Sequence, residues 1–293
     1  MKEIVLFCAS YNKDMHRAKR MAQSVQRFNT DNILLYLSVP EKDLSMFQEF
    51  FGDIPCNFLT DQEILNKTAK IYGPLPKFYP GYLLQQLIKL EFWRMNFCHN
   101  YAWLDSDSYF IRPFGIKDFF HDATTPYTVM NEPEELFEFA EKYNTKVKDN
   151  FINMAEKFKK LFNRSGANYD FGYPLLIWSC KVLKSLYKEH LLLENKTIYE
   201  LLYNYPCEMQ LYGEYVLYSK KIPVVPSKLF FKFFHYKEQF FESQMMGESE
   251  YSLAKDYMGI VMQSNWTKIK EKKKNDFARF KRFLNRIQQA LAN

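Results

Sequence analysis

The chain has 293 residues, enough for one large α/β domain or two smaller ones. Hydrophobic residues make up 47% of it, aromatic residues 18% and charged residues 25%, a composition that excludes a disordered or collagen-like chain. The net charge of +6 is concentrated in residues 267–293, where nine basic residues stand against two acidic ones, and the near-neutral remainder argues against a nucleic-acid partner.

The first residues are Met1, Lys2 and Glu3, and the apolar run 4–7 that follows is too short for a secretory signal. No apolar run approaches the roughly 18 residues of a membrane-spanning helix. The five cysteines are widely spaced and form no C-x-x-C pair, so neither a disulfide framework nor a zinc site is indicated. We therefore expect a cytoplasmic protein with reduced cysteines.

Residues 4–40 predict a strand, a helix and a second strand, with the strands at 4–8 and 33–37. Continuous apolar strands that alternate with helices indicate a mostly parallel sheet with helices on both faces, and such sheets bind ligands at the carboxyl ends of their strands. The loop at Ser10 and Tyr11 is therefore a candidate nucleotide contact. The sequence contains neither a G-x-G-x-x-G nor a P-loop motif, which disfavours a dinucleotide fold and a P-loop enzyme.

A third strand is predicted at 56–59, and Asp61 follows it at the edge of the expected cleft. After a loop rich in proline and glycine, residues 82–97 predict a helix in which Gln85, Gln86 and Lys89 share one face. That helix leads into a short buried strand, Tyr101 to Leu104, which ends on the turn Asp105-Ser106-Asp107.

The second half continues the alternation of helices and strands. A helical insertion is expected at about 131–170, a strand at 172–178, helices at 197–205 and 208–219, and a last strand at 228–234 that ends on His235. Without repeats or low-complexity linkers, we expect one domain over 1–265 with an appended tail, 266–293.

The turn Asp105-Ser106-Asp107 is the main chemical signal. A D-x-D triplet arises readily by chance, and a pair of turn-capping aspartates is the alternative interpretation. The apolar strand before it and the apolar segment after it, however, put both carboxylates on a turn at the edge of a cleft. Carboxylate oxygens suit Mg²⁺ or Mn²⁺ in a shell completed by phosphate oxygens.

Residues 101–113, YAWLDSDSYFIRP, together with the Gln85-Gln86-x-x-Lys89 helix, resemble GT-A-fold glycosyltransferases, especially bacterial enzymes that build lipopolysaccharide, lipooligosaccharide or capsule. The likeness spans most of residues 1–265. It implies a GT-A-like, Rossmann-type fold and transfer of a sugar from a nucleotide-sugar, most commonly a UDP-sugar, to a glycan or lipid-linked glycan.

The same resemblance implies roles for individual residues. Asp105 and Asp107 would bridge to the donor diphosphate through Mn²⁺ or Mg²⁺, and His235 would complete the metal shell, unless it is a structural histidine in an aromatic strand. Lys89 and Gln86 would contact the donor, the alternative for Lys89 being a solvated helix lysine. Asp61 would accept hydrogen bonds from the base or ribose.

An inverting reaction also needs a carboxylate that removes the proton of the acceptor hydroxyl. Glu208, which opens a predicted helix, is the first candidate for this base, and Asp170 is the second. A retaining enzyme needs no such base, and the sequence leaves inversion and retention open.

The tail predicts an amphipathic basic helix, since its apolar residues from Phe277 onward recur every three or four positions. Such a helix can lie on the anionic inner leaflet, which would make the protein peripheral to the membrane. The alternative is that the apolar stripe packs on the domain or on a second subunit, as in a homodimer.

Three other functions compete with the transferase. A phosphatase of the haloacid-dehalogenase type would carry its D-x-D after the first strand and a later acidic pair, which this sequence lacks. A catalytically inert protein with the same fold is the second, and a nucleotidyltransferase, which usually has a glycine-rich phosphate loop near the N-terminus, is the third.

Overall fold

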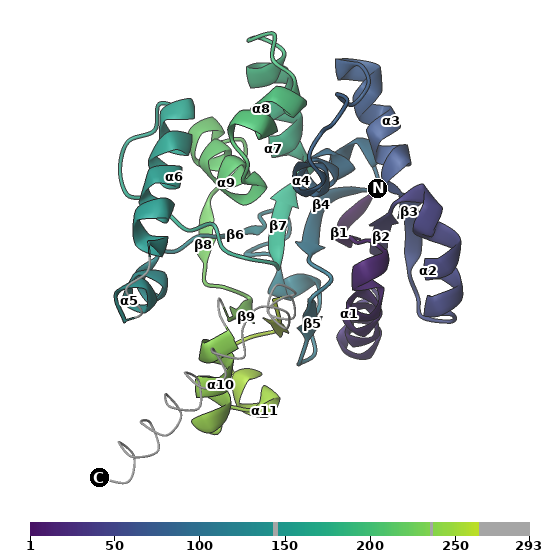
Figure 1. The fold of residues 1–293 in the computed structure, drawn as a ribbon, viewed down its shortest axis with the longest axis vertical. Coiled ribbons are helices and arrows are strands. Elements are labelled where there is room, and N and C mark those ends of the chain that lie inside the picture. Colours follow the sequence, from purple (N-terminus) through teal and green to yellow (C-terminus); the bar gives the residue numbers. More distant parts are fainter. Residues whose placement is uncertain (143–145, 235–236, 264–293) are drawn as a thin grey trace.

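The structure is a computed structural model that describes residues 1–142, 146–234 and 237–263. Its central sheet has five strands in the order β3-β2-β1-β4-β7 (Figure 1). They are β1 (Lys2–Ala9), β2 (Leu35–Val39), β3 (Asn57–Thr60), β4 (Cys98–Leu104) and β7 (Leu176–Ser179). The first four strands pair in parallel and β7 is antiparallel to β4, which confirms the predicted α/β class with a mostly parallel sheet.

Both faces of this sheet are buried, as the unbroken apolar strands predict. Phe7 and Trp103 point into a core covered by α3 (Asp61–Tyr72), α4 (Gly81–Glu91), α7 (Cys180–Ser185), α8 (Ile198–Asn204) and α9 (Glu208–Ser219). Leu6 and Leu104 point into a second core covered by α1 (Met15–Phe28) and α2 (Leu44–Phe51). The period of two along β1 and β4 thus supplies both cores.

The segment expected to be helical holds α5 (Glu134–Lys142) and α6 (Val147–Leu161), which contact each other, and α6 also packs on α9. Two helices differ from the sequence analysis, which placed none at α2 or α3. The start of α3 carries a capping box, in which the Thr60 hydroxyl accepts from the Glu63 amide at 3.2 Å and the Glu63 carboxylate accepts from the Thr60 amide at 2.6 Å. This T-x-x-E pattern was the overlooked signal.

Two small sheets lie beside the central one, and one of them brings residues near 260 next to the segment that follows β4. A three-stranded sheet joins β5 (Ser108–Phe110), β10 (Gly259–Val261) and β9 (Phe231–Phe233), while β6 (Tyr127–Val129) pairs with β8 (Val225–Ser227). Two further helices, α10 (Lys237–Met245) and α11 (Glu250–Leu253), lie between β9 and β10. The expected strand 228–234 is therefore shorter than predicted, and β10 was not foreseen.

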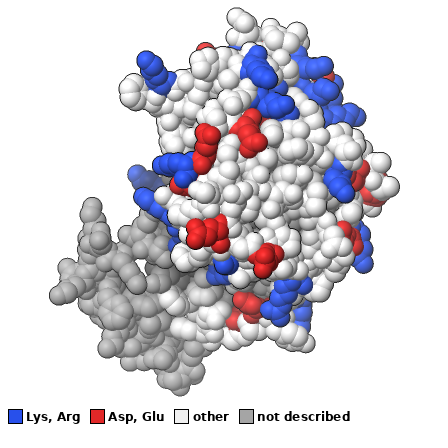
Figure 2. Space-filling view, turned by 90° about the vertical axis from the view of Figure 1, so that its right-hand side faces the viewer, with Lys and Arg blue, Asp and Glu red and all other residues white. Residues whose placement is uncertain are grey.

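Within the described residues, no helix is long and apolar enough to span a membrane. On the face where α1, α2 and α3 lie, acidic and basic side chains are interspersed and form no continuous basic patch (Figure 2). The two predictions on His235 and on the tail 266–293 fall outside the described residues.

Candidate active site

The carboxylate turn is held rigidly at both ends. Strand β4 ends at Leu104, and the Asp105 carbonyl accepts hydrogen bonds from the Ser108 amide at 3.1 Å and the Ser108 hydroxyl at 2.6 Å. From the far end of the chain, the Met262 amide donates to the Asp107 carbonyl at 2.8 Å. The turn thus fixes where its two carboxylates lie, as a metal or phosphate site requires.

This turn opens into a cavity of about 680 Å³ at the carboxyl end of the parallel strands. The ends of β1 and β3, the first turns of α4 and the start of α9 form the other walls. Of the residues proposed from the sequence, those that line the cavity are Ser10, Tyr11, Asp61, Gln86, Lys89, Asp105, Asp107 and Glu208. The structure therefore brings together residues from five separate stretches of the chain.

Lys89 joins two of these carboxylates. Its side chain is only 5% exposed, and its ammonium lies 2.8 Å from Asp105 Oδ1 and 3.1 Å from Glu208 Oε1. The same ammonium lies 3.9 Å from the centre of the Trp103 ring. Burial lowers the pKa of Lys89, but the charges of Asp105 and then Glu208 outweigh it and raise the pKa above its ordinary value.

Lys89 is therefore protonated, and its ammonium is already paired with the carboxylates of Asp105 and Glu208. The sequence analysis considered a donor contact or a solvated surface lysine. Burial excludes the solvated interpretation, and the two ion pairs make Lys89 a residue that orients Asp105 and Glu208.

The cavity carries an excess of negative charge. Asp14, Asp61, Asp105, Asp107 and Glu208 line it, and Lys89 is the only lysine or arginine among the described lining residues. A diphosphate placed here would face strong repulsion unless a cation accompanied it. The described residues contain no group of three or more histidine, cysteine, aspartate or glutamate side chains that could hold a metal ion. The ligands that the turn itself offers to a cation are the carboxylates of Asp105 and Asp107. That donor set fits Mg²⁺ or Mn²⁺, which take one or two carboxylates together with substrate phosphate oxygens.

Two further lining residues present polar groups suited to a ligand. The Ser10 hydroxyl is buried and has no hydrogen-bond partner in the described parts of the chain. Asp61 accepts a hydrogen bond from the Ser38 hydroxyl at 2.6 Å. Burial raises the pKa of Asp61 to about 6, and the Ser38 hydrogen bond opposes part of that rise.

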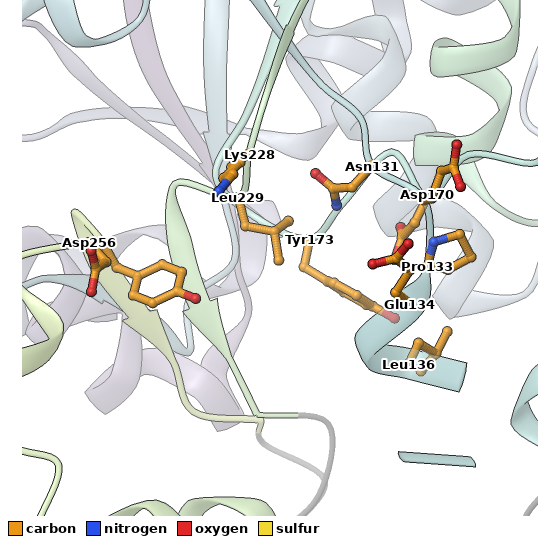
Figure 3. A pocket seen from close by; sticks show the side chains of 11 residues that line it. Asn131, Pro133, Glu134, Leu136, Asp170, Tyr173, Lys228, Leu229 and Asp256 are labelled. Carbon is orange, nitrogen blue, oxygen red and sulfur yellow. The ribbon is translucent and has the colours of Figure 1, made fainter. Parts of the chain in front are cut away.

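Asp170, the second candidate base, does not line this cavity. It lies in another cavity with Asn131, Glu134 and Tyr173, where one of its oxygens accepts from the Gly172 amide at 2.8 Å (Figure 3). The sequence order suggested a position near the carboxylate turn, but the segment before β7 pairs with Asn131 and not with the end of β4.

Several residues that line the cavity were not predicted from the sequence. Asp14, Tyr82 and Gln263 also face the cavity. Asp14 follows the Ser10-Tyr11 loop closely enough to have been proposed with it. The Trp103 ring lies beneath the Lys89 ammonium. Nothing in the sequence around Trp103 indicates this contact, because Trp103 has the pattern of an ordinary buried strand residue.

A model of the family of unknown function DUF6492 matches residues 4–280. No curated protein matches the sequence. The crystal structure of mouse xyloside xylosyltransferase 1, apo form, shares 10% identity and a TM-score of 0.47, over 90% of this chain and 99% of its own. The apo structure of the bifunctional glycosyltransferase WbbM shares 9% identity and a TM-score of 0.49, over 90% of this chain and 46% of its own.

Proposed function

The chain belongs to the family of unknown function DUF6492, and from its own cavity we propose that it is a metal-dependent glycosyltransferase using a nucleotide-sugar donor. One observation carries this proposal: Asp105 and Asp107 stand on a fixed turn at the carboxyl end of β4 and open into the 680 Å³ cavity. A cavity of this size suits a nucleotide-sized ligand.

The charge of the cavity supports a donor that arrives with a cation. Asp14 is paired with Arg17 at 2.6 Å, which leaves four lining carboxylates against the single ammonium of Lys89. This excess of negative charge disfavours a free anion and favours a complex of a divalent cation with a nucleoside diphosphate. Asp105 and Asp107 would hold the cation, which when bound would stabilise the negative charge that grows on the leaving diphosphate. His235 remains a proposed third ligand, and a UDP-sugar remains the proposed donor.

The remaining residues divide into contacts and positioning groups. Ser10, Tyr11, Asp61 and Gln86 offer hydrogen-bonding groups along the cavity wall for the ribose and base. Lys89 holds Asp105 in place from below, since its ammonium pairs with that carboxylate at 2.8 Å. Lys89 therefore acts as a positioning group, and its contact with the donor stays a prediction.

Glu208 is the better of the two candidate bases because it alone lines the cavity. The salt bridge to Lys89 uses Oε1, and the other oxygen can accept the proton of an acceptor hydroxyl. In an inverting reaction, Glu208→Gln would lower kcat by roughly 100-fold or more. In a retaining reaction, the same change would mainly disturb Lys89 and Asp105.

The position of β1 argues against the phosphatase alternative. In this fold β1 lies at the centre of the sheet and ends at Ala9, followed by Ser10. The nucleophilic aspartate expected after the first strand is therefore absent. The D-x-D turn follows β4 instead.

The experiment is a screen of sugar nucleotides with Mn²⁺, with release of the nucleoside diphosphate followed by NMR. We expect at least one donor to be hydrolysed slowly, to depend on the metal and to be inert with Asp107→Asn. A bacterial surface glycan, which the sequence resemblance supports, is the acceptor class to add next. Failure of every nucleotide-sugar to react or bind would contradict the proposal.

A further inference from the structure

A second cavity, of about 480 Å³, lies apart from the D-x-D turn. Four chain segments wall it: the start of α5 with the residues before it, the segment 170–173, residues 228–229 after β8, and residues 256–257 before β10. Figure 3 shows Tyr173 and Leu229 between Asp256 on one side and Asp170 and Glu134 on the other.

These walls are fixed by backbone pairing. Asn131 and Asp170 exchange two backbone hydrogen bonds, at 2.9 and 2.8 Å, and β6 pairs with β8 on the adjacent side. The Tyr173 ring stacks on Phe233, with ring centres 3.8 Å apart. These contacts fix the relative positions of the walls at Asn131, Asp170 and Tyr173.

The lining combines acidic groups with aromatic and aliphatic surface. Its charged members are Glu132, Glu134, Asp170, Asp256 and Lys228, which leaves an excess of three negative charges. No salt bridge holds Asp170 within the described residues. Burial raises its pKa above the ordinary value, and the Gly172 amide hydrogen bond opposes that rise.

This chemistry selects a ligand. Carboxylates accept hydrogen bonds from hydroxyl or ammonium groups, while Tyr173, Tyr257 and Leu229 offer surfaces for C–H groups. An anionic ligand would meet a negatively charged wall. The ligand that fits is a polyol without negative charge, such as a neutral sugar or an amino sugar.

The start of α9 connects the walls of the two cavities. Glu208 lines the first cavity, and Gln210, two residues further along α9, donates to the Tyr169 carbonyl at 3.4 Å, next to the wall at Asp170. Burial, together with the charges of Glu208 and Asp170, raises the pKa of the Cys207 thiol to about 12. The charges of the two carboxylates, one in each cavity, thus both reach this thiol.

We propose that the 480 Å³ cavity binds the acceptor, and that the part of the acceptor it holds is a neutral or amino sugar without phosphate or carboxylate groups. The name acceptor rests on the proposed transferase function. The chemistry of the ligand rests on the lining alone.

The test uses saturation-transfer NMR on the full chain with methyl glycosides of neutral hexoses, of 2-amino hexoses and of a hexuronic acid. The variants are Asp170→Asn, which keeps an oxygen for the Gly172 amide, and the exposed Asp256→Asn. Glu49→Gln, an exposed acidic residue of α2, is the matched control. Binding of UDP with Mn²⁺ is measured on every variant in parallel.

We expect a neutral or amino glycoside to bind the wild type and the control, and to bind each cavity variant at least fivefold more weakly. UDP binding should be unchanged throughout. Absence of any glycoside signal, insensitivity to both variants, or equal binding of the hexuronide would overturn the inference while leaving the donor site intact. If the wild type binds a glycoside but does not bind UDP with Mn²⁺, the proposed transferase function is overturned and the cavity remains a saccharide-binding site.

Discussion

Lys89 couples residues that are far apart in the sequence. It pairs with Asp105 on the turn and with Glu208 at the start of α9, and its side chain is buried. The residue types and their order could be predicted from the sequence, because carboxylates after a buried strand and polar residues on one helix face are local patterns. The pairing could not, because it depends on how α4 and α9 pack over β4.

Replacing Lys89 with Met should destabilise the protein. Removing the ammonium leaves the largely buried Glu208 without its cation, and breaking such a pair costs about 3 kcal/mol of unfolding free energy. Urea denaturation measures this loss, with Lys67→Met on the exposed side of α3 as the control.

Adding Glu208→Gln to Lys89→Met should recover part of the lost stability, since the uncompensated charge is then removed. If Lys89→Met is as stable as the wild type, the charge pairing described here does not hold.

Asp61 should make stability depend on pH. Its pKa of about 6 in the folded protein lies above the roughly 3.9 of an unfolded aspartate, so the native state binds more protons between these values. The unfolding free energy should therefore fall by about 2 kcal/mol as the pH rises from 4 to 6, and change little above that range on account of this group.

Asp61→Asn removes this titration. The difference in unfolding free energy between wild type and Asp61→Asn, measured by urea denaturation at several pH values, should shift in favour of the variant as the pH rises from 4 to 6. Parallel curves for the two proteins would show that Asp61 titrates normally.

At the scale of elements, the strands and helices with strong periodicity were predictable, and α2 and α3 were missed. The T-x-x-E capping box of Thr60 and Glu63 marks the start of α3. The helix was not predicted because the apolar strand before it and the proline- and glycine-rich loop after it are the stronger local patterns. The placement of Asp170 could not be predicted, because the bridge from Asn131 to Asp170 is a contact across the inserted helices α5 and α6.

Helix α9 approaches its neighbour closely at Gly213. A Cβ at this position would lie 2.1 Å from the Phe171 ring, next to Asp170. Gly213→Ala should therefore lower the unfolding free energy by about 1–3 kcal/mol, the usual cost of overpacking. Gly81→Ala is the control, because nothing lies within 4 Å of the added Cβ. Equal stability of the two variants would mean that α9 can move away from Phe171 freely.

At the scale of the whole molecule, the order of strands brings the ends of β1, β3 and β4 to one edge of the sheet. The sequence predicted a parallel sheet with its site at the strand ends, but not the central place of β1 or the return of β10 to the turn. These depend on long-range pairing, which local patterns do not encode.

The uneven charge of the chain supports a prediction about membranes. If residues 267–293 form the basic amphipathic helix that their sequence indicates, the full chain should sediment with anionic liposomes and a chain ending at residue 266 should not. High salt should weaken the binding, and neutral liposomes should show little. Equal sedimentation of both chains would point to packing on the domain or on a second subunit.

The central claim is that Asp105 and Asp107 bind a nucleoside diphosphate through a divalent cation. Isothermal titration of the full chain with UDP, with and without Mn²⁺, tests it most directly. We predict that binding requires Mn²⁺ and weakens at least tenfold in Asp107→Asn, while Asp170→Asn binds as the wild type does. Binding that is equally strong without the metal, or unaffected by Asp107→Asn, would contradict the account.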